Sequence, residues 1–97
     1  MPETRTAFRR TIEHATGAQL QELALLAIDA SGVIMAALML TRDTDAQRLA
    51  DAIYARGDRV AGEIDCREVS RADLLALVEV QEQGSTWLRD HRRQFLS

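Results

Sequence analysis

The segment from Leu20 to Leu40 constrains the fold most, because apolar residues occupy nearly its whole circumference when it is drawn as a helix. At about 100° per residue, one stripe comprises Leu20, Leu23, Ala24, Ala27, Ile28, Ser31, Ile34, Met35 and Leu38. The opposite stripe comprises Leu25, Leu26, Val33, Ala36, Ala37, Met39 and Leu40. A soluble helix with two apolar sides must be covered on both, by its own chain or by a partner.

The run from Val33 to Leu40 could also be a buried strand, because Gly32 inside a helix costs about 1 kcal/mol relative to alanine. Alanine, methionine and leucine dominate the run, and β-branched residues are few. No second strand-like segment exists with which it could pair. We therefore predict a helix.

A second amphipathic helix is predicted after the polar residues 41–45. Thr44 is its expected N-cap, with Gln47 three residues later completing a capping box. Gly57 lies on the apolar side, where it would let a neighbouring helix pack closely. The stripe of this helix comprises Ala46, Leu49, Ala50, Ile53, Val60 and Ile64.

A long final helix is predicted from the Ser70 cap to about Leu96, with Gly84 as a place where it could bend. A short helix around Phe8 precedes the others, and Gly17 is expected to end it or bend it. The predicted fold is all-α: one domain over residues 1–97, built as a small antiparallel up-down helical bundle of three long helices and one short N-terminal helix.

Size favours association. A chain of 97 residues buries only about 60–65% of its unfolded surface, so its stability is modest and a second subunit would add to it. We expect a homodimer.

Charge and composition narrow the classes of partner. All 12 cationic side chains are arginine and the net charge is −3. The arginines are concentrated near the two ends, and the acidic middle of the chain would repel phosphate backbones, so no nucleic-acid partner is expected. The polar N-terminus lacks the apolar core of a signal peptide, and Cys66 is a lone cysteine, which together favour the cytoplasm.

A membrane span is a further alternative for the apolar segment. The stretch Ala24 to Leu40 is shorter than the roughly 20 residues that a span needs, and Asp29, Ser31 and Gly32 interrupt it. We expect no membrane partner. If Asp29 were buried, it would need an arginine partner.

Catalytic and metal-binding patterns are weak. His14, Cys66 and His91 lack the i, i+3 or i, i+4 spacing of a zinc site, so neither a metal nor a cofactor is expected. Cys66 has no convincing base, and no glycine-rich phosphate loop follows a strand. The sequence favours a protein that is not an enzyme.

Partner binding is therefore assigned to apolar positions. The first candidate is the second stripe of the apolar helix, at Leu25, Leu26, Val33, Met39 and Leu40. A second candidate lies off the main stripe of the final helix, at Val80 and Trp87, because tryptophan is enriched in interfaces.

One family resemblance follows from these residues. The polar turn, the segment Ala46 to Arg56 with Arg56 after Ile53, and the arginine-rich end Leu88 to Arg93 resemble the small bacterial flagellar export chaperones of the FliT and FlgN type. The resemblance covers about three quarters of the chain. It implies a cytoplasmic, non-enzymatic protein that shields an apolar helix of a client and presents it to export machinery.

Two alternatives remain open. The same apolar stripe suits a small homodimeric regulator or inhibitor, of the kind that phages and plasmids encode, which occludes a larger protein. A helical enzyme similar to chorismate mutase could recruit Arg48, Arg56 and Arg59 around a dianionic substrate. The absence of lysine argues against this enzyme.

Overall fold

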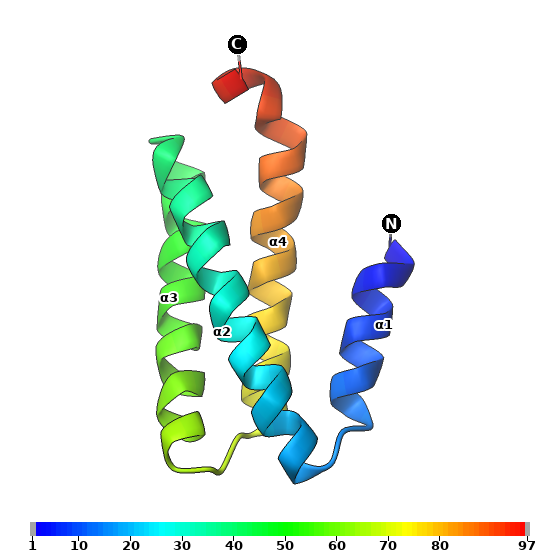
Figure 1. The fold of residues 1–97 in the computed structure, drawn as a ribbon. Helices are drawn as coiled ribbons and strands as arrows, with labels where there is room; N and C mark the ends of the chain where they lie inside the picture. Colours follow the sequence, from blue (N-terminus) through cyan, green and yellow to red (C-terminus); the bar gives the residue numbers. More distant parts are fainter. Residues whose placement is uncertain (1, 97) are drawn as a thin grey trace.

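The computed structural model describes residues 2–96, and within them the side chains of residues 7–92. Residues 2–96 form four helices and no strand, so the all-α prediction is confirmed for this part of the chain (Figure 1). Residues 33–40 are helical, as predicted. The helices are α1 (Pro2–Glu13), α2 (Gly17–Leu40), α3 (Thr44–Asp65) and α4 (Arg71–Leu96).

Helices α2, α3 and α4 lie side by side and run in alternating directions, whereas the shorter α1 lies beside α4 (Figure 1). Each of the three long helices packs on the other two, and α1 packs chiefly on α4. The molecule measures 44 × 28 × 16 Å along its principal axes. The smallest extent corresponds to about two packed helices, because helix axes lie roughly 8–10 Å apart.

Helix α2 begins earlier than expected. Thr16 is its N-cap, accepting a hydrogen bond from the Gln19 amide at 3.4 Å, while the Gln19 side chain accepts one from the Thr16 amide at 2.8 Å. Gly17 is therefore the first residue of α2, and the expectation that it ends the first helix is wrong. Helix α1 has already ended at Glu13.

The predicted cap of α3 is also corrected. Asp43, not Thr44, is the N-cap, and its Oδ1 accepts hydrogen bonds from the amides of Asp45 at 2.8 Å and Ala46 at 3.2 Å. A carboxylate satisfies two free amides here and is stabilised by the positive end of the helix dipole. Thr44 is consequently the first helical residue.

The core lies between α2, α3 and α4. Its fully buried large side chains are Leu38, Ile53, Val60, Leu74 and Leu77, together with Ile12 from α1. Gly57 faces α2 and α4, with Ile28 and Leu77 about 4 Å from the position that a β-carbon would take, which confirms its predicted packing role. Helix α4 continues through Gly84, where a β-carbon would lie only 3.1–3.3 Å from Ile34, Leu38 and Ile53.

Two polar side chains within the core satisfy each other. Gln81 of α4 donates hydrogen bonds from Nε2 to the Ala27 carbonyl and to Ser31 Oγ of α2, both at 2.7 Å. The Ser31 hydroxyl in turn donates to the Ala27 carbonyl at 3.0 Å. These bonds fix the alignment of α4 along α2, because a shifted helix would bury an unpaired amide.

Helix α1 is attached to α4 by apolar and polar contacts. Ile12 is fully buried. Arg71, at the start of α4, donates hydrogen bonds to the carbonyl of Ile12, in the last turn of α1, and to the carbonyl of Ala15, just after it. Arg9 forms an ion pair with Glu82. Both arginines thus link the shorter helix to α4.

Candidate partner-binding surface

The outer face of α2 is a row of large apolar side chains that the other described residues leave exposed. Val33 is 73% exposed, and the others are Leu25 (50%), Leu26 (60%), Met39 (62%) and Leu40 (83%). We call these five residues the outer face of α2. The first stripe of the same helix is buried or half-buried against α3 and α4, as predicted. The two apolar sides of α2 therefore have different environments.

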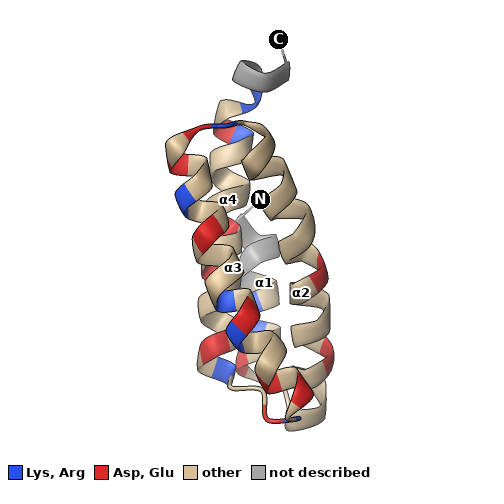
Figure 2. Ribbon diagram, turned by 90° about the vertical axis from the view of Figure 1, so that its left-hand side faces the viewer, with Lys and Arg blue, Asp and Glu red and all other residues tan. Residues whose placement is uncertain are grey.

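Charge is nearly absent from α2. The helix carries two acidic residues, Glu22 and Asp29, and no arginine, whereas α3 alternates acidic and basic residues along its surface (Figure 2). Both acids are exposed, so Asp29 needs no buried arginine partner. The outer face therefore offers no cationic group that could recognise a phosphate or a carboxylate.

Two shallow apolar grooves flank the outer face. One, of about 390 Å³, lies between α1, α2 and α4 and is lined by residues that include Phe8, Leu26, Ala30 and Ile34. The other, of about 320 Å³, lies between α2 and α3 and is lined by residues that include Gly32, Met35, Tyr54 and Gly57. Together they extend the apolar surface on both sides of α2.

Val80 does not belong to this surface. Its side chain is 8% exposed and lies in the hydrophobic core, so its assignment to partner binding is wrong. Because Val80 lies beside the main apolar stripe of α4, the sequence predicted that its side chain is on the surface. The stripe is wider than predicted, because α4 is covered by α3 on one side as well as by α2 on the other.

Trp87 occupies a different surface. It is half-buried, and its ring stacks on His91 with the centroids 4.1 Å apart and the planes 9° apart. His91 Nδ1 lies 2.8 Å from the Trp87 carbonyl. A groove of about 430 Å³ beside Trp87 is lined by residues of α1, α3 and α4 but by none of α2. The two predicted binding positions therefore do not form one site.

The length argument against a membrane span is corrected by the structure. Helix α2 has 24 residues and is long and apolar enough to cross a bilayer. The prediction counted only from Ala24, whereas the helix begins at Gly17. Glu22 and Asp29 lie on the exposed side of this helix, where burial in lipid would remove water from their carboxylates.

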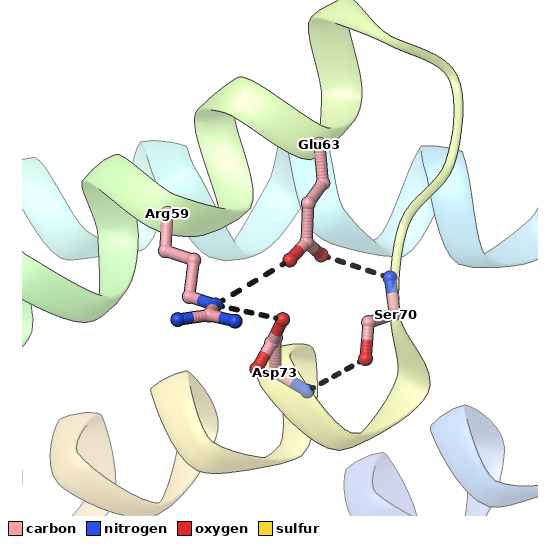
Figure 3. Close-up of polar contacts among 4 residues, drawn as sticks. All are labelled: Arg59, Glu63, Ser70 and Asp73. Carbon is pink, nitrogen blue, oxygen red and sulfur yellow. Dashed lines mark hydrogen bonds and ion pairs between the residues drawn. The ribbon is translucent and has the colours of Figure 1, made fainter.

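Two carboxylates meet at the junction of α3 and α4 (Figure 3). Arg59 Nε lies 3.0 Å from Asp73 Oδ2 and 3.7 Å from Glu63 Oε2, and Glu63 Oε1 accepts the Ser70 amide at 2.9 Å. Burial, followed by the hydrogen bond with Asp73, raises the pKa of Glu63. The hydrogen bond with Glu63, followed by that from Arg59, lowers the pKa of Asp73.

This carboxylate pair has a structural role. Glu63 binds the backbone amide of Ser70, the N-cap of α4, while the Ser70 hydroxyl accepts the Asp73 amide at 3.3 Å. The two acids therefore hold the connection between α3 and α4, and no described groove beside α2 includes them. The sequence predicted the Ser70 cap but gave no sign of the link from Glu63.

The remaining candidate chemical groups are dispersed. Among the described residues, no three His, Cys, Asp or Glu side chains are grouped so that they could hold a metal ion. Cys66 is exposed. Arg48, Arg56 and Arg59 are exposed on α3, and Arg59 is already paired with Asp73.

Two neighbours of the outer face were missed from the sequence. Phe8 of α1 lines the first groove, and Tyr54 of α3 lines the second while being 64% exposed. The position of Tyr54 off the apolar stripe of α3 was the one sign in the sequence that its ring is exposed. Phe8 could not be placed beside α2, because its helix gives no indication of which surface it covers.

Comparison of the chain with protein-family models, curated proteins and solved structures gives no match.

Proposed function

We propose that this chain is a non-enzymatic protein-binding module in which the outer face of α2 receives an apolar helix of a partner. The observation that carries the proposal is the exposure, by half or more, of five large apolar side chains on one helix. Contiguous apolar surface of this kind marks interaction sites in soluble proteins. A fold of antiparallel up-down helices supplies the rigid support.

A helix is the partner element that fits best. The outer face is straight and flanked by shallow grooves on both sides, and an amphipathic helix places its apolar residues in such grooves. The edge of a β-sheet could not be completed here, because α2 satisfies its own backbone hydrogen bonds. The resemblance to flagellar export chaperones adds a role to this geometry, namely shielding a client helix until export.

A photo-crosslinking experiment tests the proposal. A benzophenone amino acid replaces Val33 in one variant and Ala55 in another; both positions are exposed, but Ala55 lies on the solvent side of α3. After irradiation in the cytoplasm of a bacterial host, we expect adducts with a defined partner from the Val33 position only. The partner segment, identified by mass spectrometry, should be an apolar helix.

A second variant separates binding from folding. Leu26→Glu places a charge on the outer face and should abolish the adducts while circular dichroism and the thermal transition of the dilute, unassociated chain are unchanged, because Leu26 is 60% exposed. Equal adducts from Val33 and Ala55, or adducts that survive Leu26→Glu, would contradict the proposal.

A further inference from the structure

A repeat of seven residues runs along one edge of the outer face. Leu23, Leu26, Ala30, Val33, Ala37 and Leu40 follow one another at intervals of three, four, three, four and three residues. This spacing is that of the contact line between two helices in a coiled coil. We call these six residues the α2 seam. All six are exposed or half-buried, so the seam is open to a partner.

The seam alternates large and small side chains in its middle. Leu26 and Val33 are large, and Ala30 and Ala37 are small. Two parallel copies would place each residue against itself, so that alanine layers alternate with layers of two large side chains. Two antiparallel copies would place Leu26 against Ala37 of the partner subunit and Val33 against Ala30 of the partner subunit. Every central layer would then pair one large side chain with one small one, which packs without voids.

Charge supports the same orientation. Glu22 and Asp29 flank the N-terminal half of the seam, and Arg42 lies just beyond its C-terminal end. Among the described residues, neither Glu22 nor Arg42 forms an ion pair with the rest of the chain. Parallel copies would place Glu22 and Asp29 beside their own counterparts, whereas antiparallel pairing separates these acids and brings Glu22 near the turn after α2 of the partner subunit, which holds Arg42 and Asp43. It also places Asp29 beside the small side chain of Ala36 of the partner subunit, where water can reach it.

We propose that the α2 seam is occupied by the seam of a second copy of this chain, in an antiparallel two-fold dimer. The inference rests on the proposed function, because it names α2 of a second copy as the apolar helix that the outer face receives. It is an isologous contact, in which the same residues serve both subunits. The 18 residues of the seam span about 27 Å, so the interface is near the lower size limit of specific contacts and the dissociation constant should be micromolar.

Sedimentation velocity from about 1 to 500 µM tests for the dimer at concentrations that bracket micromolar affinity. Wild-type chain should convert from monomer to dimer across this range. Val33→Glu should raise the dissociation constant by more than about 100-fold, because each interface contains two copies of the residue in apolar layers. The control Ala55→Glu adds the same charge at an exposed position of α3 and should leave the dimer intact.

Disulfide formation tests the orientation, in a Cys66→Ser background that removes the exposed native thiol. Leu26→Cys mixed with Ala37→Cys should give a crosslinked heterodimer, because the antiparallel seam places these positions opposite each other. Leu26→Cys alone should not crosslink. Its two copies would lie about 16 Å apart, well beyond the roughly 7 Å between α-carbons that a disulfide can bridge.

Three outcomes would overturn the inference. The first is a monomer at 500 µM, which leaves the photo-crosslinking test of partner binding unaffected. The second is rapid crosslinking of Leu26→Cys with itself, which indicates a parallel pair. The third is flotation of monomeric chain with phosphatidylcholine vesicles, which indicates that lipid covers α2. The circular dichroism spectrum of Val33→Glu should match that of the wild type, because Val33 is 73% exposed. A match shows that the variant is folded, so that its loss of dimer reports on the seam.

Discussion

Arg67 is a residue in a conformation that suits glycine. It follows the C-cap of α3 with φ of 57°, and its amide donates to the Ile64 carbonyl at 3.0 Å. Left-handed backbone costs a residue with a β-carbon on the order of 1 kcal/mol. Arg67→Gly should therefore raise the free energy of unfolding by about 0.5–1 kcal/mol, measured by urea denaturation. Ala55→Gly, inside α3, should lower it by about 1 kcal/mol; a loss of stability in both variants would contradict this account.

Glu63 and Asp73 should oppose each other in the dependence of stability on pH. The folded pKa of Glu63 is raised, so its contribution to stability is present below its unfolded pKa and is lost as pH rises through the folded value, above 4.5. The folded pKa of Asp73 is lowered, so its contribution is present above its unfolded pKa and is lost as pH falls through a value below 3.8.

Substitutions separate the two contributions. Glu63→Gln retains an acceptor for the Ser70 amide and removes the charge, so it should increase stability at pH 7, and the difference from the wild type should shrink as pH falls below 4.5. Asp73→Asn loses the charged partner of Arg59 and should decrease stability at pH 7, with the difference shrinking as pH falls below 3.8. Urea denaturation between pH 3 and 7 measures both. The opposite order of the two variants at pH 7 would show that this coupling has been misassigned.

At the scale of the helices, Gly84 and Gly62 are both helical glycines that differ in the space around them. A β-carbon at Gly84 would be 3.1–3.3 Å from three core side chains, whereas one at Gly62 would have nothing within 4 Å. Gly84→Val should lower the free energy of unfolding by about 1–3 kcal/mol because it forces α4 away from α2 and α3. Gly62→Ala should raise it by about 1 kcal/mol. Thermal denaturation of the two variants provides the comparison, and equal effects would contradict the packing argument.

The helices were largely predictable from periodicity, and the exceptions have physical causes. The inner stripe of α2 was identified because it repeats at the helical period over about five turns. Val80 was misplaced because sequence gives the direction of a side chain on its helix but not how many neighbours surround that helix. The N-cap of α3 was missed because Asp43 and Thr44 both offer oxygen atoms, and only the backbone geometry selects one.

The candidate surface was predictable for a similar reason. The five exposed side chains of α2 lie on the second apolar stripe, opposite the stripe that was expected to face the core. The grooves beside them were not predictable, because Phe8 and Tyr54 reach α2 from other helices. Long-range packing of this kind leaves no local pattern.

At the scale of the whole molecule, association should appear as concentration-dependent stability. If two chains pair through α2, raising the protein concentration from about 5 to 500 µM should raise the melting temperature by roughly 3–6 °C, since only the folded state associates. Val33→Glu should melt at the same temperature at both concentrations. Scanning calorimetry checks this, and an unchanged wild-type melting temperature would count against association.

The inner side of α2 has the small residues Ala24, Ala27 and Ser31 at its centre, between the buried Leu20 and Leu38, while the large exposed residues lie on the outer side. If the outer face binds a partner as proposed, recognition and folding are carried by opposite sides of one helix. Selection, or a protein engineer, could rewrite the exposed positions to suit a new binding specificity while the inward positions preserve the scaffold.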